Sequence, residues 1–487
     1  MKKIEFTLLG LLFVGLSLLF LAGCEGGLGE SYSINPIDKL SFSTDTLSFD
    51  TVFTDIGSAT KEFMIYNTNN DPLEIESIML ANPEVSGFSI NVDGRKGNRF
   101  QQVEILSHDS LYLFVEVNID PTKVNTPLIV RDSILFYLNG NRQVIQLEAV
   151  GKNVKLIDHG LHITKDSILT SERPFLVYDS LVIDPNVTLT IKEGAVFYMH
   201  KNAFIKVKGA IVAEGTPSRP VIFRGDRLDF ILDDVLPYDR TPGQWGGITF
   251  ESSSVGNVLN NVRVRNGQYG LRLYSKEIEN KKMTLYNTRI TNMSQTAFWA
   301  QQAWVEATNC EFSNAADGVV VLAGGTYQFT HCTLVDYLSL ETRFLPGVQL
   351  NPYTNEGANE KLSVTFRNCI IDGSFSATSA QSPGEIQFYT ADNTLMNYQF
   401  NHCVLKIGEQ TSDSFMDCSF GESPLYKLLG GDKNKYAYDY RLDSITAGVD
   451  QVDPLIIKAY PLDFNAINRF ESLVPTVGAY QYVPTKK

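Results

Sequence analysis

The sequence predicts an all-β protein in which a β-sandwich precedes a parallel β-solenoid. Six short blocks of alternating apolar and polar residues recur between Leu259 and Leu405, and each carries Asn or His at the same place. Intervals of 26, 22, 22, 37 and 34 residues separate these positions (261, 287, 309, 331, 368 and 402), a range typical of solenoid repeats. A different pattern, short strand-like runs broken by turn signals, fills residues 40–152 and predicts the sandwich.

The N-terminal segment has the features of a lipoprotein signal. A basic start precedes an apolar run over residues 6–21, which is short for a membrane span and ends in small residues. The sequence Leu21-Ala-Gly-Cys24 resembles a bacterial lipobox. The resemblance implies a signal peptide (1–23), lipid attachment to Cys24 and a tether over residues 24–39. It also implies an outer-membrane lipoprotein of the cell envelope, facing the periplasm or the cell exterior.

Residues 40–152 predict an immunoglobulin-like β-sandwich. Seven or so strand-like runs occur there, and turn signals such as Asp93-Gly94 and Asn139-Gly140 separate them. The order of Phe49–Phe53 and a final Leu147–Gly151 resembles immunoglobulin-like modules of the spindle-protein and Hydin type. That resemblance implies a spacer or a docking surface and supplies no catalytic residue.

Each solenoid block predicts a bend at its Asn or His. Phe329 and Cys332 both favour the buried face, which a straight strand with alternating sides does not allow, so the chain must turn at His331. A one-residue corner takes the left-handed conformation, in which Asn and His are enriched. We call the predicted set the corner column, and its members are Asn261, Asn287, Asn309, His331, Asn368 and His402.

Four cysteines directly follow the corners: Cys310, Cys332, Cys369 and Cys403. Neighbouring strands lie about 4.7–4.9 Å apart, whereas the Cβ atoms of a disulfide lie roughly 3.5–4.5 Å apart. The spacing therefore predicts a ladder of small buried thiols. Disulfides and a zinc site are less favoured alternatives, and no CxxC spacing supports zinc.

Two further segments resemble known bacterial proteins. Gly209–Thr216, Arg219–Phe223 and Gly243–Ile248 resemble the opening coils of right-handed parallel β-helix proteins, including surface lipoproteins of Bacteroidetes-like bacteria. Val477-Gly-Ala-Tyr-Gln-Tyr482 resembles a C-terminal module with the signature Gly-Ala-Tyr-Glu-Tyr. The resemblance implies a right-handed β-helix over residues 155–430 and a cap over residues 431–487 that covers the last rung.

Insertions in the repeat indicate where ligands are expected. The two longest intervals place loops at Leu340–Lys361 and Ser374–Gly384, and a third loop spans Gly225–Gly243. The third loop holds several Asp and Arg residues, among them Asp233, Asp234 and Arg240. These are candidates for calcium binding or for the proton abstraction of a polysaccharide lyase; the alternative is that they are only solvated.

Arginines on the outward side of the strands form a second candidate site. Arg263, Arg265, Arg272 and Arg289 alternate with apolar residues, and their guanidinium groups suit the carboxylates of uronic-acid polymers. Trp245 is a further ligand-binding candidate. The alternative is pairing between rungs with residues such as Glu311.

Aromatic side chains form a third candidate set, although at strand spacing they are more often core. The set is Trp299, Trp304, Tyr353, Phe388 and Tyr389. The histidines His159, His162 and His200 stand alone in the sequence, and no Ser/His/Asp order, phosphate loop or metal-ligand spacing is recognisable.

The formal net charge of −14 disfavours nucleic acid as a partner. These observations predict a lipid-anchored, non-catalytic envelope protein that binds an extended glycan or an outer-membrane protein partner, with no cofactor unless calcium binds. The alternative is a polysaccharide lyase or glycoside hydrolase acting on an acidic polysaccharide. The ligand, the membrane leaflet and the oligomeric state are left open.

Overall fold

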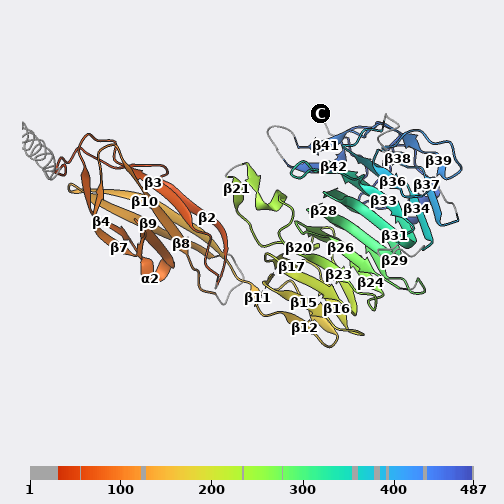
Figure 1. Cartoon of the computed structure of the whole chain (residues 1–487), viewed down its shortest axis with the longest axis horizontal. Coiled ribbons are helices and arrows are strands. Elements are labelled where there is room, and N and C mark those ends of the chain that lie inside the picture. The colour runs from red at the N-terminus through yellow and green to blue at the C-terminus, as the bar shows by residue number, and fades with distance from the viewer. Residues whose placement is uncertain are drawn as a thin grey trace, which may run out of the picture. The chain divides into compact units, whose positions relative to one another are not determined.

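The computed structural model describes residues 31–54, 56–121, 128–232, 235–276, 278–353, 360–377, 384–390, 394–430 and 436–484. The protein is all-β, with two compact units, Met1–Lys152 and Asn153–Lys487 (Figure 1). Within the described ranges, none of the helices combines the length and the hydrophobicity needed to cross a bilayer. Cys24, with the predicted signal peptide, lies outside the described residues.

In the first unit, two five-stranded sheets enclose one hydrophobic core. One sheet is ordered β1 (Ser41–Phe42), β3 (Lys61–Tyr66), β8 (Ser110–Val117), β5 (Phe88–Val92) and β6 (Arg95–Gly97). The other is ordered β2 (Thr46–Phe53), β10 (Asn141–Lys152), β9 (Leu128–Leu138), β4 (Leu73–Leu80) and β7 (Arg99–Ile105), and a short helix α2 (Pro83–Ser86) precedes β5.

Alternation along the strands fills this core. Phe63 and Ile65 of β3 are buried, and so are Leu113 and Val115 of the neighbouring β8, because alternate side chains of a strand point to the same face; Phe63 pairs directly with Leu113. The predicted turns join the strands: Asp93-Gly94 links β5 to β6, and Asn139-Gly140 links β9 to β10. All four turn residues have positive φ, as a two-residue hairpin turn of this sequence type requires.

The second unit is a parallel solenoid built from two long sheets. The 11-stranded sheet consists of β11 (Lys155–Ile157), β14 (Phe175–Val177), β17 (Val196–Met199), β20 (Val221–Gly225), β25 (Val262–Arg265), β28 (Arg289–Met293), β30 (Glu311–Ala315), β32 (Thr333–Asp336), β35 (Ile370–Gly373), β38 (Val404–Leu405) and β40 (Ser419–Phe420). Each strand pairs in parallel with the next, so each turn of the chain adds one rung.

The 17-stranded sheet receives two strand segments from most turns of the chain. Its strands are β12 (Leu161–Ile163), β13 (Ser167–Leu169), β15 (Ser180–Ile183), β16 (Thr188–Lys192), β18 (Phe204–Val207), β19 (Ala210–Glu214), β23 (Gly247–Phe250), β24 (Asn257–Asn260), β26 (Leu271–Tyr274), β27 (Met283–Tyr286), β29 (Thr296–Thr308), β31 (Gly318–Thr330), β33 (Val348–Asn351), β34 (Leu362–Arg367), β36 (Ile386–Phe388), β37 (Met396–Asn401) and β39 (Phe415–Met416). The two sheets enclose one continuous core.

The corner column joins the two sheets. All six of its residues have φ between 47° and 53°, the left-handed conformation. Their backbone N–H groups donate to carbonyls that precede the next corner; Asn287 N, for example, donates to Thr308 O at 3.1 Å. Consecutive corners therefore stack.

The thiols and the aromatic rings stack in the same way. Cys310, Cys332, Cys369 and Cys403 are completely or almost completely buried and unpaired by disulfides, and Cys332 N donates to the sulfur of Cys369 at 3.4 Å. The rings of Phe329, Phe366, Phe400 and Phe415 lie parallel with centroids 4.9 to 5.1 Å apart. These distances match the separation of adjacent parallel strands.

The C-terminal segment lies along the outside of the 11-stranded sheet. It contains the hairpin strands β41 (Tyr426–Leu429) and β42 (Tyr438–Leu442) and the helix α3 (Pro454–Ala459). Gly478 N donates to Asn368 O at 2.8 Å, and Ala479 N donates to Thr333 Oγ1 at 3.0 Å. The segment that was expected as a cap over the last rung therefore contacts earlier rungs of the sheet as well.

The C-terminal segment docks there because part of the outer face of the 11-stranded sheet is apolar. Val335, Ile370 and Val404 point away from the solenoid core and pack with side chains of the C-terminal segment such as Val449 and Val477. Without this segment, a row of apolar side chains on three successive rungs would face water.

Candidate functional site

The C-terminal segment leaves part of the 11-stranded sheet open as a groove. One wall is the short 3-10 helix η1 (Tyr238–Arg240), which follows the projecting hairpin β21 (Phe230–Leu232) and β22 (Leu236–Pro237); the other wall is β42 (Figure 1). We call this the outer groove, and the part of it beside Tyr480 and Arg441 has a volume of about 300 Å³. Its charged and tyrosine lining consists of Asp239, Arg240, Arg265, Arg289, Glu311, Tyr436, Tyr438, Asp439, Tyr440, Arg441 and Tyr480.

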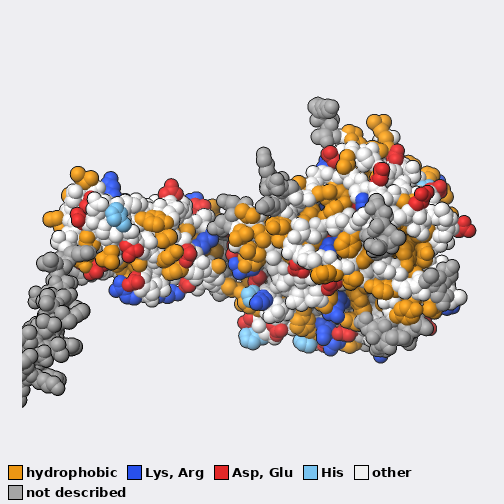
Figure 2. Space-filling view, turned by 45° about the horizontal axis from the view of Figure 1, so that its top comes forward, with side chains coloured by type: hydrophobic (Ala, Val, Ile, Leu, Met, Phe, Trp, Pro, Cys, Tyr) orange, Lys and Arg blue, Asp and Glu red, His pale blue; other side chains and the backbone are white. Residues whose placement is uncertain are grey.

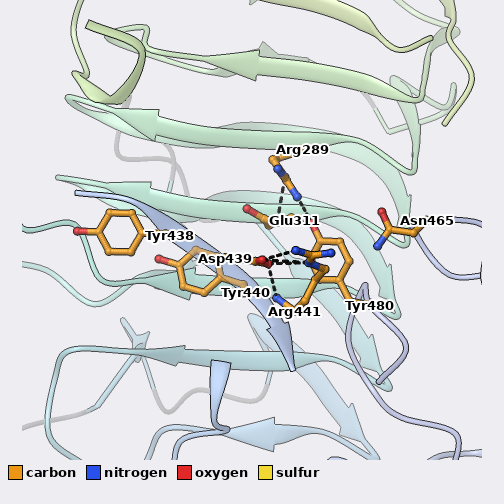
Figure 3. Close-up of a pocket in the computed structure, with 8 residues that line it drawn as sticks. All are labelled: Arg289, Glu311, Tyr438, Asp439, Tyr440, Arg441, Asn465 and Tyr480. Carbon is orange, nitrogen blue, oxygen red and sulfur yellow. Dashed lines mark hydrogen bonds and ion pairs between the residues drawn. The ribbon is translucent and has the colours of Figure 1, made fainter. Parts of the chain in front are cut away.

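Arg289, Glu311 and Tyr480 contact one another in the groove (Figure 3). Arg289 Nε lies 3.0 Å from Glu311 Oε2, and the Tyr480 hydroxyl contacts both side chains. Burial raises the pKa of Tyr480 well above its ordinary value. Burial alone would lower the pKa of Arg289, but Glu311 and Tyr480 outweigh it and the net shift is upward.

Asp239 organises the wall formed by η1. Its carboxylate lies 3.0 Å from Arg224 Nη2 and 3.0 Å from Arg265 Nη1. The side-chain amide of Asn266 donates to the carbonyls of Asp239 and Thr241, each at 3.0 Å. Arginines from two rungs and one asparagine thus hold this loop against the sheet.

The opposite wall is held by a hydroxyl and an ion pair. Tyr440 OH donates to Asn314 Oδ1 at 2.6 Å. Arg441 pairs with the carboxylate of Asp439 on the same strand, and Arg441 lowers the pKa of Asp439 against the opposing effect of burial. Figure 3 shows this pair on β42, facing Arg289 and Tyr480.

Sequence reasoning missed a second column of left-handed asparagines that supports both walls. Asn266, Asn292 and Asn314 have φ of 66°, 63° and 54°. Each follows a member of the corner column by five residues, so the same intervals of 26 and 22 residues recur. That repetition was the available signal.

The structure separates the predicted arginines. Arg265 and Arg289 line the outer groove together with Arg240. Arg263 is covered, because its guanidinium carbon lies 4.1 Å from the centre of the Phe464 ring and its Nη1 donates to Asn287 O; burial lowers its pKa to about 10. The predicted alternative, pairing with Glu311, holds for Arg289.

Trp245 is not a ligand contact. Its side chain is completely buried, and its indole N–H donates to Arg265 O at 2.9 Å. The indole ring points into the solenoid core and thereby supports the sheet below the groove.

The other aromatic candidates lie outside the outer groove. Trp299 and Trp304 are half-buried on the outward side of β29, so the expectation that they belong to the core is wrong for both. Tyr353 is half-buried and Tyr389 is 43% exposed, whereas Phe388 packs against the core.

The carboxylates of the loop after β20 are engaged by basic side chains. Asp226 lies 2.6 Å from His200 Nδ1, and Asp229 pairs with Arg227. Asp233 and Asp234 lie outside the described residues. In the described ranges, no three His, Cys, Asp or Glu side chains converge as a metal-binding group.

The histidines do not stand alone as the sequence suggested. His159 and His162 lie beside Asp158 and Asp184, at 2.9 and 3.5 Å. His200 pairs with Asp226 and stacks on Tyr178 with ring centroids 4.0 Å apart.

No family model and no curated protein matches the sequence. Solved structures with partial similarity include a family 123 glycoside hydrolase from Clostridium perfringens (10% identity, 24% of this chain and 26% of that chain, TM-score 0.16) and an alkylpurine DNA glycosylase from Pseudomonas fluorescens (11%, 24% and 31%, TM-score 0.16). A protein of unknown function from Porphyromonas gingivalis W83 matches at 9% identity over 26% of this chain and 60% of that chain, with a TM-score of 0.17. The chain thus spans only 26% to 60% of their lengths, and scores this low support no argument about function.

Proposed function

We propose that the protein is a lipid-anchored, non-catalytic binding protein of the cell envelope, and that its outer groove holds an acidic glycan. The observation that carries the proposal is the gathering of Arg240, Arg265, Arg289 and Arg441 around one groove of a chain with a net charge of −14. The same lining holds three carboxylates, Asp239, Glu311 and Asp439, each paired with one of these arginines, so the arginines outnumber the carboxylates by one. Figure 2 shows acidic and basic side chains interspersed over one face of the molecule. Guanidinium groups bind planar carboxylates through paired hydrogen bonds, which suits the uronate units of such a glycan.

Aromatic side chains in the groove favour a sugar over a simple anion. Tyr436 and Tyr438 are half-buried on the wall formed by β42 and its approach. A tyrosine offers an apolar ring and a polar hydroxyl, and both groups match a sugar ring.

The groove chemistry favours binding over the alternative of a polysaccharide lyase. A lyase needs a group that removes a proton from the sugar ring near neutral pH. Burial raises the pKa of the Tyr438, Tyr440 and Tyr480 hydroxyls, and the Glu311 carboxylate already contacts Arg289 and Tyr480. These three hydroxyls and the Glu311 carboxylate, all on described lining residues, are therefore poor bases for removing that proton.

The remaining architecture is consistent with presentation of this groove at a membrane. We infer an immunoglobulin-like spacer over residues 40–152 from its two packed sheets and a lipid anchor at Cys24 from the lipobox. The solenoid is inferred to be right-handed, because crossover connections between parallel strands are right-handed in about 98% of cases.

Affinity electrophoresis of the chain from Ser31 onward tests the binding proposal. The expected result is retardation by polygalacturonate or alginate and none by dextran. Arg240→Gln and Arg441→Gln should each weaken binding about 10- to 100-fold, because each removes one charged hydrogen-bonding group. The matched control is Arg219→Gln, which removes an exposed arginine paired with Glu193 outside the groove.

The outcome that would overturn the proposal is absence of binding to every acidic polymer, or an equal loss of binding in the control. Release of an unsaturated uronide, detected by its ultraviolet absorbance, would instead support the lyase.

A further inference from the structure

The 17-stranded sheet carries a cationic and aromatic cluster on its outward side. Leu271 and Leu273 of β26 and Phe298 of β29 are fully buried. Alternation therefore turns Arg272 and Trp299 outward, where both are half-buried. The strand register pairs these two residues, so they sit on adjacent rungs about 4.8 Å apart.

Two tyrosines hold the Arg272 side chain in place. Its guanidinium carbon lies 3.9 Å from the centre of the Tyr269 ring, and its Nη2 donates to Tyr274 OH at 2.8 Å. Among the described residues, no carboxylate lies within ion-pair distance of Arg272. This differs from Arg289, which is matched by the carboxylate of Glu311. Arg272 therefore presents a fixed positive charge that no carboxylate of the described residues pairs with.

An aromatic ring lies directly beside this charge. The centroids of Tyr274 and Trp299 are 5.0 Å apart, with 54° between the ring planes. Trp304 provides a useful contrast on the same strand. The cation nearest its ring, Lys281, is paired with Glu306 at 2.6 Å, so that position has an aromatic ring but no unmatched charge.

We propose that Tyr269, Arg272, Tyr274 and Trp299 form a second subsite, for one acidic sugar unit. The carboxylate of a uronate pairs with Arg272, and the C–H face of its ring stacks on Trp299. A ligand with both a carboxylate and an apolar ring face uses both halves of the cluster, whereas an acidic peptide uses only the first. The ligand class of this subsite rests on the proposed function. Its residues lie on the 17-stranded sheet and the outer groove lies on the 11-stranded sheet, so binding at each site can be tested independently of the other.

Tryptophan fluorescence of the chain from Ser31 onward tests the subsite, because Trp299 is one of only three tryptophans. Titration with trigalacturonate should give a saturable change, and neither maltotriose nor triglutamate should give it. Trp299→Phe should abolish the signal, whereas Trp304→Phe should retain it. Arg272→Gln should weaken the apparent affinity about 10- to 100-fold, with Arg272→Lys intermediate because it keeps the charge and loses the planar fork.

Calorimetry distinguishes this site from the outer groove. The wild type should bind two trigalacturonate molecules per chain. Arg272→Gln should bind only one at low ligand concentration, and the double variant Arg240→Gln/Arg441→Gln should also bind only one. If the proposed function fails and the subsite is correct, the fluorescence change persists with a single bound ligand.

The subsite proposal is overturned if Arg272→Gln titrates like wild type, if Trp299→Phe retains the change, or if triglutamate binds as tightly as trigalacturonate. Equal urea midpoints of Arg272→Lys, Trp299→Phe and wild type establish that any loss is not caused by unfolding.

Discussion

The side-chain amide nitrogen of Asn368 lies 3.3 Å from Nε2 of His331, so two neighbours of the corner column contact each other between rungs. His331 is completely buried. Burial, together with the charge of the buried Arg469, holds the pKa of His331 well below its ordinary value. An ionisable ring thus occupies a place that most other turns give to asparagine.

Replacement of His331 by Asn should reduce the loss of stability in acid. The folded protein keeps this ring neutral, whereas the unfolded chain protonates it below a pH of about 6.5, so acid favours unfolding of the wild type. The variant lacks this effect. When the pH falls from about 7.5 to about 5, its free energy of unfolding should therefore decrease by about 2 kcal/mol less than that of the wild type. Urea unfolding at the two pH values measures it. His402→Asn, at the partly exposed end of the column, is the control, and parallel curves for wild type and His331→Asn would contradict the prediction.

Removal of the Arg343 charge should be strongly destabilising. Arg343 is buried with two carboxylates, at 3.0 Å from Asp336 Oδ2 and 2.7 Å from Glu385 Oε2. Arg343→Met leaves both carboxylates buried without their cation, which should cost about 3–5 kcal/mol. Chemical denaturation measures the loss, with Arg219→Met as the control for an exposed pair worth less than about 1 kcal/mol. A similar small effect of both variants would show that the buried charges find other partners.

The left-handed corners predict an unusual order of substitution effects at Asn287. This residue has φ of 47°, so Asn287→Ala should cost about 1–2 kcal/mol, whereas Asn287→Gly should cost little because glycine adopts this conformation freely. At an ordinary strand position alanine would be the better tolerated residue. Thermal unfolding of the two variants measures the order, and alanine equal to or better than glycine would count against a strained corner.

Thiol accessibility should divide the five cysteines that follow Ser31. Four are buried, and Cys418, in the last turn of the solenoid, is partly exposed. Maleimide should label Cys418 in the native protein and all five in denaturant, as counted by intact mass. Fewer than five labels under denaturing, non-reducing conditions would reveal a disulfide and contradict the thiol ladder.

Much of the solenoid could be predicted because its rules are local. The left-handed corner depends on the conformational preference of one Asn or His, and the outward direction of Arg265 and Arg289 depends on strand alternation. The asparagine column at Asn266, Asn292 and Asn314 was predictable by the same argument, since it repeats the same intervals. Trp245 was misassigned because its place before a strand gave no alternation to show which way it points.

The sequence by itself determined the repeat, its corners and the face to which most strand side chains point, because these features arise from neighbours a few residues apart. Only the tertiary structure decided which outward arginines stay open. Arg263 lies under Phe464, and Arg289 meets Tyr480 from 191 positions along the chain. Such contacts depend on where the C-terminal segment docks, and this is set by the apolar outer face of several rungs together.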